Sequence, residues 1–274
     1  MQDVEFFEKG SGPKVVLFHS SASGAGQWKV LMDHFKEKFH FISVNLIGYG
    51  KTTAWTQDKV QTLFDQVKLL EKIPSLSGSR FSIVGHSFGG SVAMKAAKHY
   101  RDRLEKLVLV EPNPFYLLGQ EKRTEAFAEV LVLRNKIKNE FNKDWEKAVS
   151  FFADYWNGKG TWHNLSEIQK ERFSIILKPN YYEWDAVFSE ETSLETWKKL
   201  LPINTTLIGA TKTVRTIREL NELFRLNCPD WNFESYCGGH MAPITSPELV
   251  NPLIIRSLLI LNLVITSNYQ LLTD

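Results

Sequence analysis

The sequence predicts an α/β fold in which a mostly parallel central sheet is flanked by helices and carries an inserted helical cap. Three observations predict it: short aliphatic runs recur along the chain, helical patterns separate them, and one long interval contains helical patterns alone. Runs that are apolar on both faces are typical of strands buried on both sides, and their alternation with helices favours a parallel sheet. We expect such strands at 14–19, 41–45, 80–85, 106–111, 204–209 and 232–237.

The two ends of this pattern differ from its middle. Residues 3–13 alternate in polarity and end in a turn, which indicates an antiparallel edge strand. Residues 121–158 are rich in helix formers and have an apolar stripe near the helical period. The sequence therefore predicts a helical cap at 114–200, between a first core part at 1–113 and a second core part at 201–274.

Composition and charge exclude several classes of partner. The chain of 274 residues is long enough for one α/β domain with an insertion. Its 33 basic and 31 acidic side chains leave a net charge of only +2, so we expect no nucleic acid and no membrane partner. The first ten residues have no basic segment followed by an apolar one, which predicts a cytoplasmic protein. Whether it forms a homo-oligomer stays open.

Two further features concern the C-terminal part of the chain. Cys228 and Cys237 are expected to be reduced thiols, with Cys237 in a buried strand. The apolar tract 253–265 is too short to cross a bilayer and is interrupted by polar side chains. We interpret it as a packed C-terminal helix, and the tail beyond residue 259 has no assigned role.

The most specific motif is "FSIVGHSFGGSVAMKAA", residues 81–97. A strand run ends at Gly85, Ser87 lies at the centre of Gly-His-Ser-Phe-Gly, and a helix of small residues follows. Glycines on both sides permit a tight turn that forces the serine into a strained, exposed position. A bare G-x-S-x-G occurs often by chance, but the strand before it and the helix after it make this one specific.

With this motif and four further segments, the sequence resembles the α/β-hydrolase fold family over nearly the whole chain outside the cap. Two of the segments depart from the family pattern: Ser20 stands where the oxyanion loop usually has glycine, and Asn45 and Thr52 replace aspartate and serine in a second loop. The matching segments are "LFHSSASGAGQW" (17–28), "NLIGYGKT" (45–52), "ETWKKLLPINTTLIGATKT" (195–213) and "CGGHMAPITSPELV" (237–250).

The resemblance implies a nucleophile, a base and an oxyanion hole. Ser87 is implied as the nucleophile, and because a serine hydroxyl is only weakly acidic, a base must take its proton. His240 follows the last strand run and two glycines, where a loop can carry it to the sheet edge; the alternative is a surface-loop histidine. The backbone N–H groups of Ser21 and Phe88 are implied as the oxyanion donors, and these do not depend on side-chain type.

The acid of the expected triad is not at its usual place. Most family members have it three residues after the glycine that is Gly209 here, and that position is Lys212, whose ammonium can only donate. Glu111 ends the strand run that follows the nucleophile's, and certain haloalkane dehalogenases place their acid there. We therefore predict Glu111 as the acid. The alternative is that Glu111 is only the structural end of its strand. In that case a carboxylate of the cap, Asp230 or water would assist the histidine.

A serine nucleophile in this family implies a carboxylic ester hydrolase (EC 3.1.1.-) that forms an acyl-enzyme from small to medium esters. No metal-ligand spacing and no nucleotide-binding glycine motif is present, so we expect no cofactor and no metal. Two alternatives remain: a carbon-carbon bond hydrolase of ring-cleavage dienoates, and a non-catalytic ligand-binding protein, which Lys212 would favour. Some cap aromatics are expected to line the pocket, from the set Phe151, Phe152, Tyr155, Trp156, Tyr181, Tyr182, Trp184 and Phe188.

Overall fold

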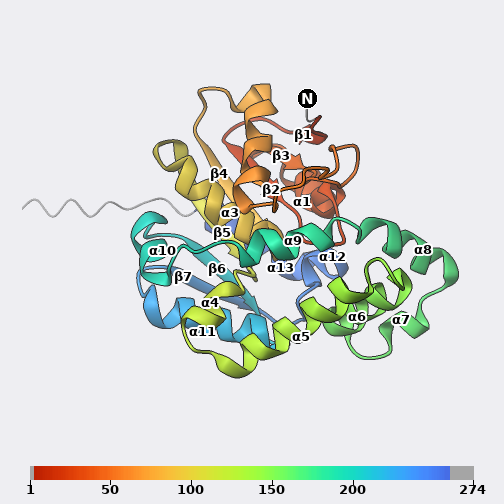
Figure 1. Cartoon of the computed structure of the whole chain (residues 1–274). Coiled ribbons are helices and arrows are strands. Elements are labelled where there is room, and N and C mark those ends of the chain that lie inside the picture. Colours follow the sequence, from red (N-terminus) through yellow and green to blue (C-terminus); the bar gives the residue numbers. More distant parts are fainter. Residues whose placement is uncertain (1–2, 260–274) are drawn as a thin grey trace, which may run out of the picture.

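The computed structural model of the chain describes residues 3–259, and its centre is a seven-stranded sheet (Figure 1). The spatial order of the strands is β1-β3-β2-β4-β5-β6-β7. Strand β1 is antiparallel to β3, as predicted for the edge, and the other neighbours are parallel. The strands are β1 (Phe6–Lys9), β2 (Lys14–Phe18), β3 (His40–Val44), β4 (Phe81–His86), β5 (Leu104–Val110), β6 (Thr206–Ala210) and β7 (Asn232–Tyr236).

The inner strands β2 to β6 are buried on both faces, as their apolar runs predict, whereas the edge strand β7 is only partly buried, so the expectation was wrong for 232–237. Val16 and Phe18 of β2 belong to one apolar cluster, whereas Val15 and Leu17 of the same strand belong to the other. Helices α2, α3 and α11 contribute to the first cluster, and helices α1 and α13 to the second. These helices are α1 (Lys29–Phe35), α2 (Leu63–Val67), α3 (Phe88–His99), α11 (Arg215–Asn227) and α13 (Pro247–Leu259), with short α12 (Ala242–Thr245) and the 3-10 turns η1 (Ala25–Trp28), η2 (Lys68–Lys72), η3 (Pro74–Leu76) and η4 (Arg101–Arg103).

The chain between β5 and β6 forms helices only, coloured yellow-green to turquoise in Figure 1. Helix α6 shows how the sequence sets the two ends of one of these helices. The carboxylate of Asp144 caps its first turn by accepting from the backbone N–H of Lys147 at 3.0 Å, and Gly158 ends it at a φ of 100°. We call this set the inserted helices: α4 (Tyr116–Gln120), α5 (Thr124–Glu140), α6 (Trp145–Asn157), α7 (Thr161–Asn164), α8 (Glu167–Ile176), α9 (Asn180–Phe188) and α10 (Leu194–Leu200).

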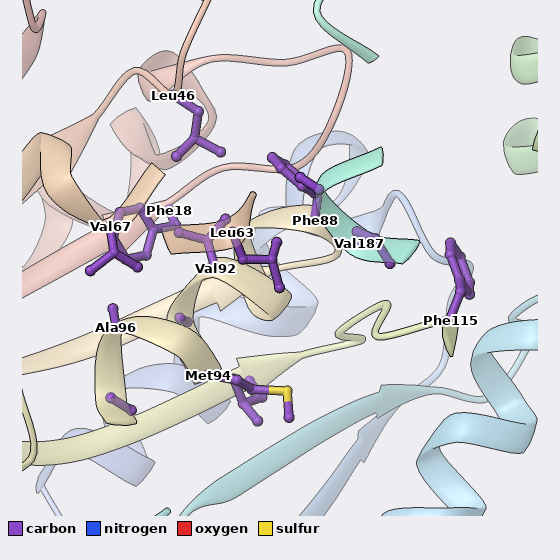
Figure 2. Close-up of a cluster of buried hydrophobic side chains, with 14 of the residues drawn as sticks. Phe18, Leu46, Leu63, Val67, Phe88, Val92, Met94, Ala96, Phe115 and Val187 are labelled. Carbon is purple, nitrogen blue, oxygen red and sulfur yellow. The ribbon is translucent and has the colours of Figure 1, made fainter. Parts of the chain in front are cut away.

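The inserted helices share an apolar cluster with the sheet domain. Figure 2 draws part of this cluster, with Phe18 of β2, Phe88 of α3, Phe115 after β5 and Val187 of α9 among its labelled members. Helix α9 contacts both α3 and α5. The inserted helices are therefore packed onto the core by apolar burial, while their boundaries as a separate cap, 114–200, stay a prediction.

The register of the central strands positions the loops that follow them. His86 at the end of β4 is opposite Val110 at the end of β5, and Val110 is opposite Ile208 of β6. Because these strands are parallel, their C-terminal ends meet at one edge of the sheet. The residues that follow, Ser87 and Glu111, are consequently neighbours at that edge.

The C-terminal part of the chain differs from its prediction at Cys237. Cys228 and Cys237 are both free thiols, but Cys237 is exposed and lies just after β7, so its predicted place in a buried strand was wrong. The strand ends one residue earlier than its apolar pattern suggested. Residues 260–265 of the predicted C-terminal helix lie outside the described residues. Every helix within residues 3–259 is too short or too polar to span a membrane.

The close packing around the turn after β4 can be tested with a glycine substitution. A Cβ atom at Gly85 would lie 2.2 Å from the carbonyl oxygen of Gly89 and 2.7 Å from Cβ of Ala93, so Gly85→Ala forces this turn apart. We expect a loss of about 1–3 kcal/mol in the free energy of unfolding, measured by urea denaturation. Gly26→Ala is the control, since a Cβ there has nothing within 4 Å. Equal unfolding midpoints for both variants would contradict the packing described.

Candidate active site

Ser87 lies in a strained turn between β4 and α3. Its φ of 55° and ψ of −118° are unfavourable for a residue with a side chain. The turn is also pressed against β2, because a Cβ at Gly89 would be 2.4 Å from the carbonyl oxygen of His19. The backbone N–H of Ser87 donates to the carbonyl of Val110 at 3.0 Å. The glycines on either side of Ser87 are thus required by close approach, as the motif predicts.

A buried chain of hydrogen bonds joins the three predicted residues. The distance from Ser87 Oγ to His240 Nε2 is 2.9 Å, and the distance from His240 Nδ1 to Glu111 Oε2 is 3.0 Å. The exposed fractions of Ser87, His240 and Glu111 are 4%, 3% and 0%. The structure therefore brings together a hydroxyl, an imidazole and a carboxylate from the loops after β4, β7 and β5, respectively.

The carboxylate of Glu111 is held by groups from β6 and the segment after it. Oε1 accepts from the backbone N–H of Ala210 at 2.7 Å and from Asn221 Nδ2 at 3.0 Å, and Oε2 accepts from Thr213 Oγ1 at 2.6 Å. Glu111 itself has a φ of 46°. The end of β6, the loop after it and helix α11 thus each supply one hydrogen-bond donor to a carboxylate that comes from β5.

The two alternative sources of a carboxylate do not reach His240. Asp230 is exposed in the segment before β7, and the buried carboxylate of Glu183 in the inserted helices contacts the oxyanion loop instead. Lys212 is exposed, and its backbone N–H donates to the carbonyl of Gly238 at 2.9 Å. Glu111 is therefore the carboxylate that faces the imidazole.

His240 is supported on two further sides. The indole of Trp156 on α6 stacks on its ring, with centroids 4.3 Å apart and an interplanar angle of 26°. Burial lowers the pKa of His86 well below its ordinary value, and the neighbouring His240 lowers it further, so His86 is neutral. Its Nδ1 accepts from Gln27 Nε2 at 3.1 Å, which leaves Nε2–H to donate to the carbonyl of His240 at 3.0 Å. His86 thus holds the backbone at His240 in place.

The residues predicted for the oxyanion hole lie beside Ser87. Ser21 and Phe88 line the same cavity, and within the described residues neither backbone N–H donates a hydrogen bond to a protein acceptor. Ser20, which replaces the usual glycine, bonds through its amide and its hydroxyl to Gln27 Oε1, at 3.0 and 3.1 Å. Both amides are therefore available to an anion, and the Ser20 hydroxyl is engaged elsewhere.

The cavity above Ser87 has an empty volume of about 390 Å³, including its opening to solvent. Of the aromatic residues considered from the sequence, Phe152, Trp156 and Trp184 line it, while the other five lie elsewhere. Phe115, which comes after β5 and directly follows Pro114, also lines the cavity and was not predicted. Helical spacing alone does not reveal which aromatic side chains face a cavity, because the docking angle of each helix decides it.

Glu183 of α9 is a second buried carboxylate in this cavity, and sequence analysis missed it. Its exposed fraction is 2%. It accepts hydrogen bonds from Ser21 Oγ at 2.5 Å, Tyr49 Oη at 2.7 Å and Asn180 Nδ2 at 2.9 Å. Burial raises the pKa of its carboxyl, although these hydrogen bonds oppose the shift. Residues 180–188 contain two acids among their aromatic residues, Glu183 and Asp185, so the sequence does not single out Glu183.

Comparison with curated proteins finds distant enzyme relatives. The chain is similar to (E)-2-((N-methylformamido)methylene)succinate hydrolase of Acinetobacter baylyi, with 25% identity over 63% of this chain and 60% of that protein. It is also similar to pimeloyl-[acyl-carrier protein] methyl ester esterase of Nitrosomonas europaea, with 26% identity over 43% of this chain and 44% of that protein. The chain thus spans less than two thirds of the length of these curated relatives.

Structural similarity covers more of the chain. A hydrolase from Pseudomonas aeruginosa superposes with a TM-score of 0.75, over 94% of this chain and 95% of the other, at 18% identity. At that identity the likeness concerns the fold. The family model described as the alpha/beta hydrolase fold matches residues 13–247, which include β2 to β7 and Ser87, Glu111 and His240. The strand order, the turn at Ser87 and this match together establish that the chain belongs to the α/β-hydrolase fold family.

Proposed function

We propose that this hydrolase cleaves small to medium carboxylic esters through an acyl-enzyme on Ser87. The observation that carries the proposal is the buried hydrogen-bond chain from Ser87 Oγ through His240 to Glu111, with distances of 2.9 and 3.0 Å. A serine next to a base, which in turn is oriented by a carboxylate, is the arrangement that activates a hydroxyl for attack on a carbonyl.

In the first half of the proposed reaction, Ser87 Oγ attacks the ester carbonyl while His240 Nε2 takes its proton. Glu111 accepts the Nδ1–H of His240, which fixes the tautomer and stabilises the imidazolium that forms. The carbonyl oxygen becomes an oxyanion, for which the amides of Ser21 and Phe88 are the proposed donors. His240 then gives its proton to the departing alcohol, and the acyl group stays on Ser87.

In the second half, a water molecule attacks the acyl-enzyme. His240 takes a proton from the water as the new oxyanion forms at the same two amides. Collapse of this intermediate breaks the bond between the acyl carbon and Ser87 Oγ, and the proton returns to Ser87. The products are one carboxylic acid and the free enzyme, and no cofactor takes part.

The lining of the cavity supports an ester with a small acyl or alcohol group. The 390 Å³ includes open solvent, and the enclosed space for the centres of water-sized spheres is about 20 Å³, so the cavity is narrow. Phe115, Phe152 and Trp184 give it a mostly apolar wall suited to a short acyl or alcohol group. The methyl ester esterase among the relatives is consistent with ester chemistry.

Removal of the nucleophile should abolish activity. We expect Ser87→Ala to lose hydrolysis of p-nitrophenyl butyrate and covalent labelling by a fluorophosphonate, because both require the serine oxygen. Ser150→Ala is the control, since that hydroxyl bonds to the carbonyl of Lys147 on the inserted helix α6. Hydrolysis by Ser87→Ala at the wild-type rate would refute the assignment.

Glu111→Gln tests the proposed acid. The amide oxygen can still accept from Ala210 and Asn221, so we expect the fold to persist, but the NH₂ group cannot accept the Nδ1–H of His240. We expect kcat to fall on the order of 10⁴-fold, as happens when a triad histidine loses its tautomer control. The measurement is kcat together with a thermal unfolding curve. An unchanged kcat would leave Glu111 a structural strand end.

A substrate panel separates the ester hydrolase from the two alternatives raised by the sequence. We expect p-nitrophenyl esters of short acyl chains to be cleaved faster than long ones, because the cavity is small, and faster than a ring-cleavage dienoate. Turnover of the dienoate alone would favour the carbon-carbon bond hydrolase. A wild-type protein that reacts with neither the esters nor the fluorophosphonate would favour the ligand-binding alternative.

A further inference from the structure

We infer that Glu183 is a positioning residue, which holds the oxyanion loop in place through the side chain of Ser21. Oxyanion binding would thereby depend on the position of helix α9, which carries Glu183. The inference rests on the proposed function, in which the amide of Ser21 is an oxyanion donor. It assigns a role to a buried carboxylate that the hydrolytic reaction itself does not use.

Glu183 reaches two consecutive residues of the oxyanion loop. Its Oε2 accepts from Ser21 Oγ at 2.5 Å. Its Oε1 accepts from Tyr49 Oη at 2.7 Å, and that phenol oxygen in turn accepts from the backbone N–H of Ala22 at 3.1 Å. Ala22 has a φ of 53°, a conformation that an alanine adopts only when its surroundings impose it. One carboxylate from α9 therefore constrains the loop at Ser21 and at Ala22.

The position of the loop matters because oxyanion donors act by being held in place before the charge develops. Removal of one such donor lowers kcat by about 10²–10³-fold in a well-studied serine protease. Ser21 contributes twice: it lines the cavity and its backbone N–H is the proposed donor, while its hydroxyl donates to Glu183. Loss of the hydroxyl contact leaves the amide in the chain but removes the constraint on its direction.

The chemical surroundings of Glu183 also point to positioning. Its exposed fraction is 2%, and none of its hydrogen-bond partners is a lysine or an arginine. A buried carboxylate with neutral partners is costly compared with an apolar side chain of similar size, so it adds little stability. What such a network does provide is a fixed geometry for the groups that donate to it.

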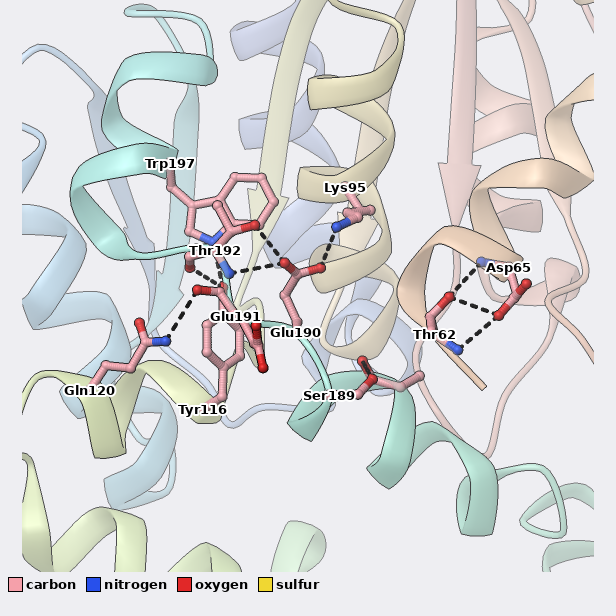
Figure 3. Close-up of polar contacts among 11 residues, drawn as sticks. Thr62, Asp65, Lys95, Tyr116, Gln120, Ser189, Glu190, Glu191, Thr192 and Trp197 are labelled. Carbon is pink, nitrogen blue, oxygen red and sulfur yellow. Dashed lines mark hydrogen bonds and ion pairs between the residues drawn. The ribbon is translucent and has the colours of Figure 1, made fainter. Parts of the chain in front are cut away.

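Glu190 provides a matched comparison within the same part of the chain. It follows α9 and joins it to the core by an ion pair with Lys95 Nζ of α3 at 2.6 Å (Figure 3). It also accepts from Thr192 Oγ1 at 2.5 Å. Glu190 does not line the cavity at Ser87. Its removal weakens the attachment of the inserted helices to the core without touching the oxyanion loop.

The test is a double-mutant cycle on Ser21→Ala and Glu183→Gln, with Glu190→Gln as the control. For each variant, kcat and KM for p-nitrophenyl butyrate are measured, and thermal unfolding checks the fold. We expect each single variant to lower kcat on the order of 10-fold, with KM changed less than about threefold, because the affected contact forms at the oxyanion. The double variant should lose no more than about 10-fold, because both changes break one link. Glu190→Gln should keep kcat within about twofold.

If Glu183→Gln fails to fold, Tyr49→Phe replaces it in the test, because it removes only the hydroxyl between Glu183 and Ala22. We expect Tyr49→Phe to lower kcat less than Glu183→Gln does. Three results would overturn the inference: wild-type kcat in both Glu183→Gln and Tyr49→Phe, a double variant whose loss is the product of the single losses, or an equal loss in Glu190→Gln. An inactive, unlabelled wild-type protein would instead overturn the proposed function and this inference with it.

Discussion

The hydrogen bond between Glu111 and His240 is the interaction on which the rest of the site depends. The imidazole can take a proton from Ser87 only through Nε2, so Nδ1 must carry its hydrogen and needs a buried acceptor. Glu111 Oε2 lies 3.0 Å away and is itself held by donors from β6 and the segment that follows it. A carboxylate at the end of β5, held by donors from β6 and beyond, thus reaches the imidazole in the segment after β7.

The parallel sheet makes this connection possible. Strands β4, β5 and β6 end side by side at one edge of the sheet, so Ser87 and Glu111, each one residue past its strand, lie near the amide of Ala210 at the end of β6. The positive φ values of Ser87 and Glu111 show that both turns at the candidate site are strained, and Ala22 of the oxyanion loop is strained in the same way. The inserted helices then cover that edge, stacking Trp156 on His240 and bringing Glu183 to the oxyanion loop.

Much of this could be predicted from the sequence, because the signals were local. Apolar runs predicted the strands, and the glycines around Ser87 predicted the turn. The lysine at 212 pointed to Glu111 by elimination, and the contact of Glu111 with His240 is possible because β5, β6 and β7 end at the same edge of the sheet. Glu183, Phe115 and the role of His86 could not be predicted, because their contacts depend on side-chain directions across packed elements. Cys237 was misplaced for a related reason: the apolar pattern does not mark where β7 ends.

A crystal structure of the fluorophosphonate adduct tests the central claim most directly, because the adduct resembles the tetrahedral intermediate. The account predicts phosphorus bonded to Ser87 Oγ, a phosphonyl oxygen within hydrogen-bond distance of the Ser21 and Phe88 amides, and His240 Nδ1 still bonded to Glu111. A structure with the adduct on another residue, or with His240 turned to a carboxylate other than Glu111, would contradict it.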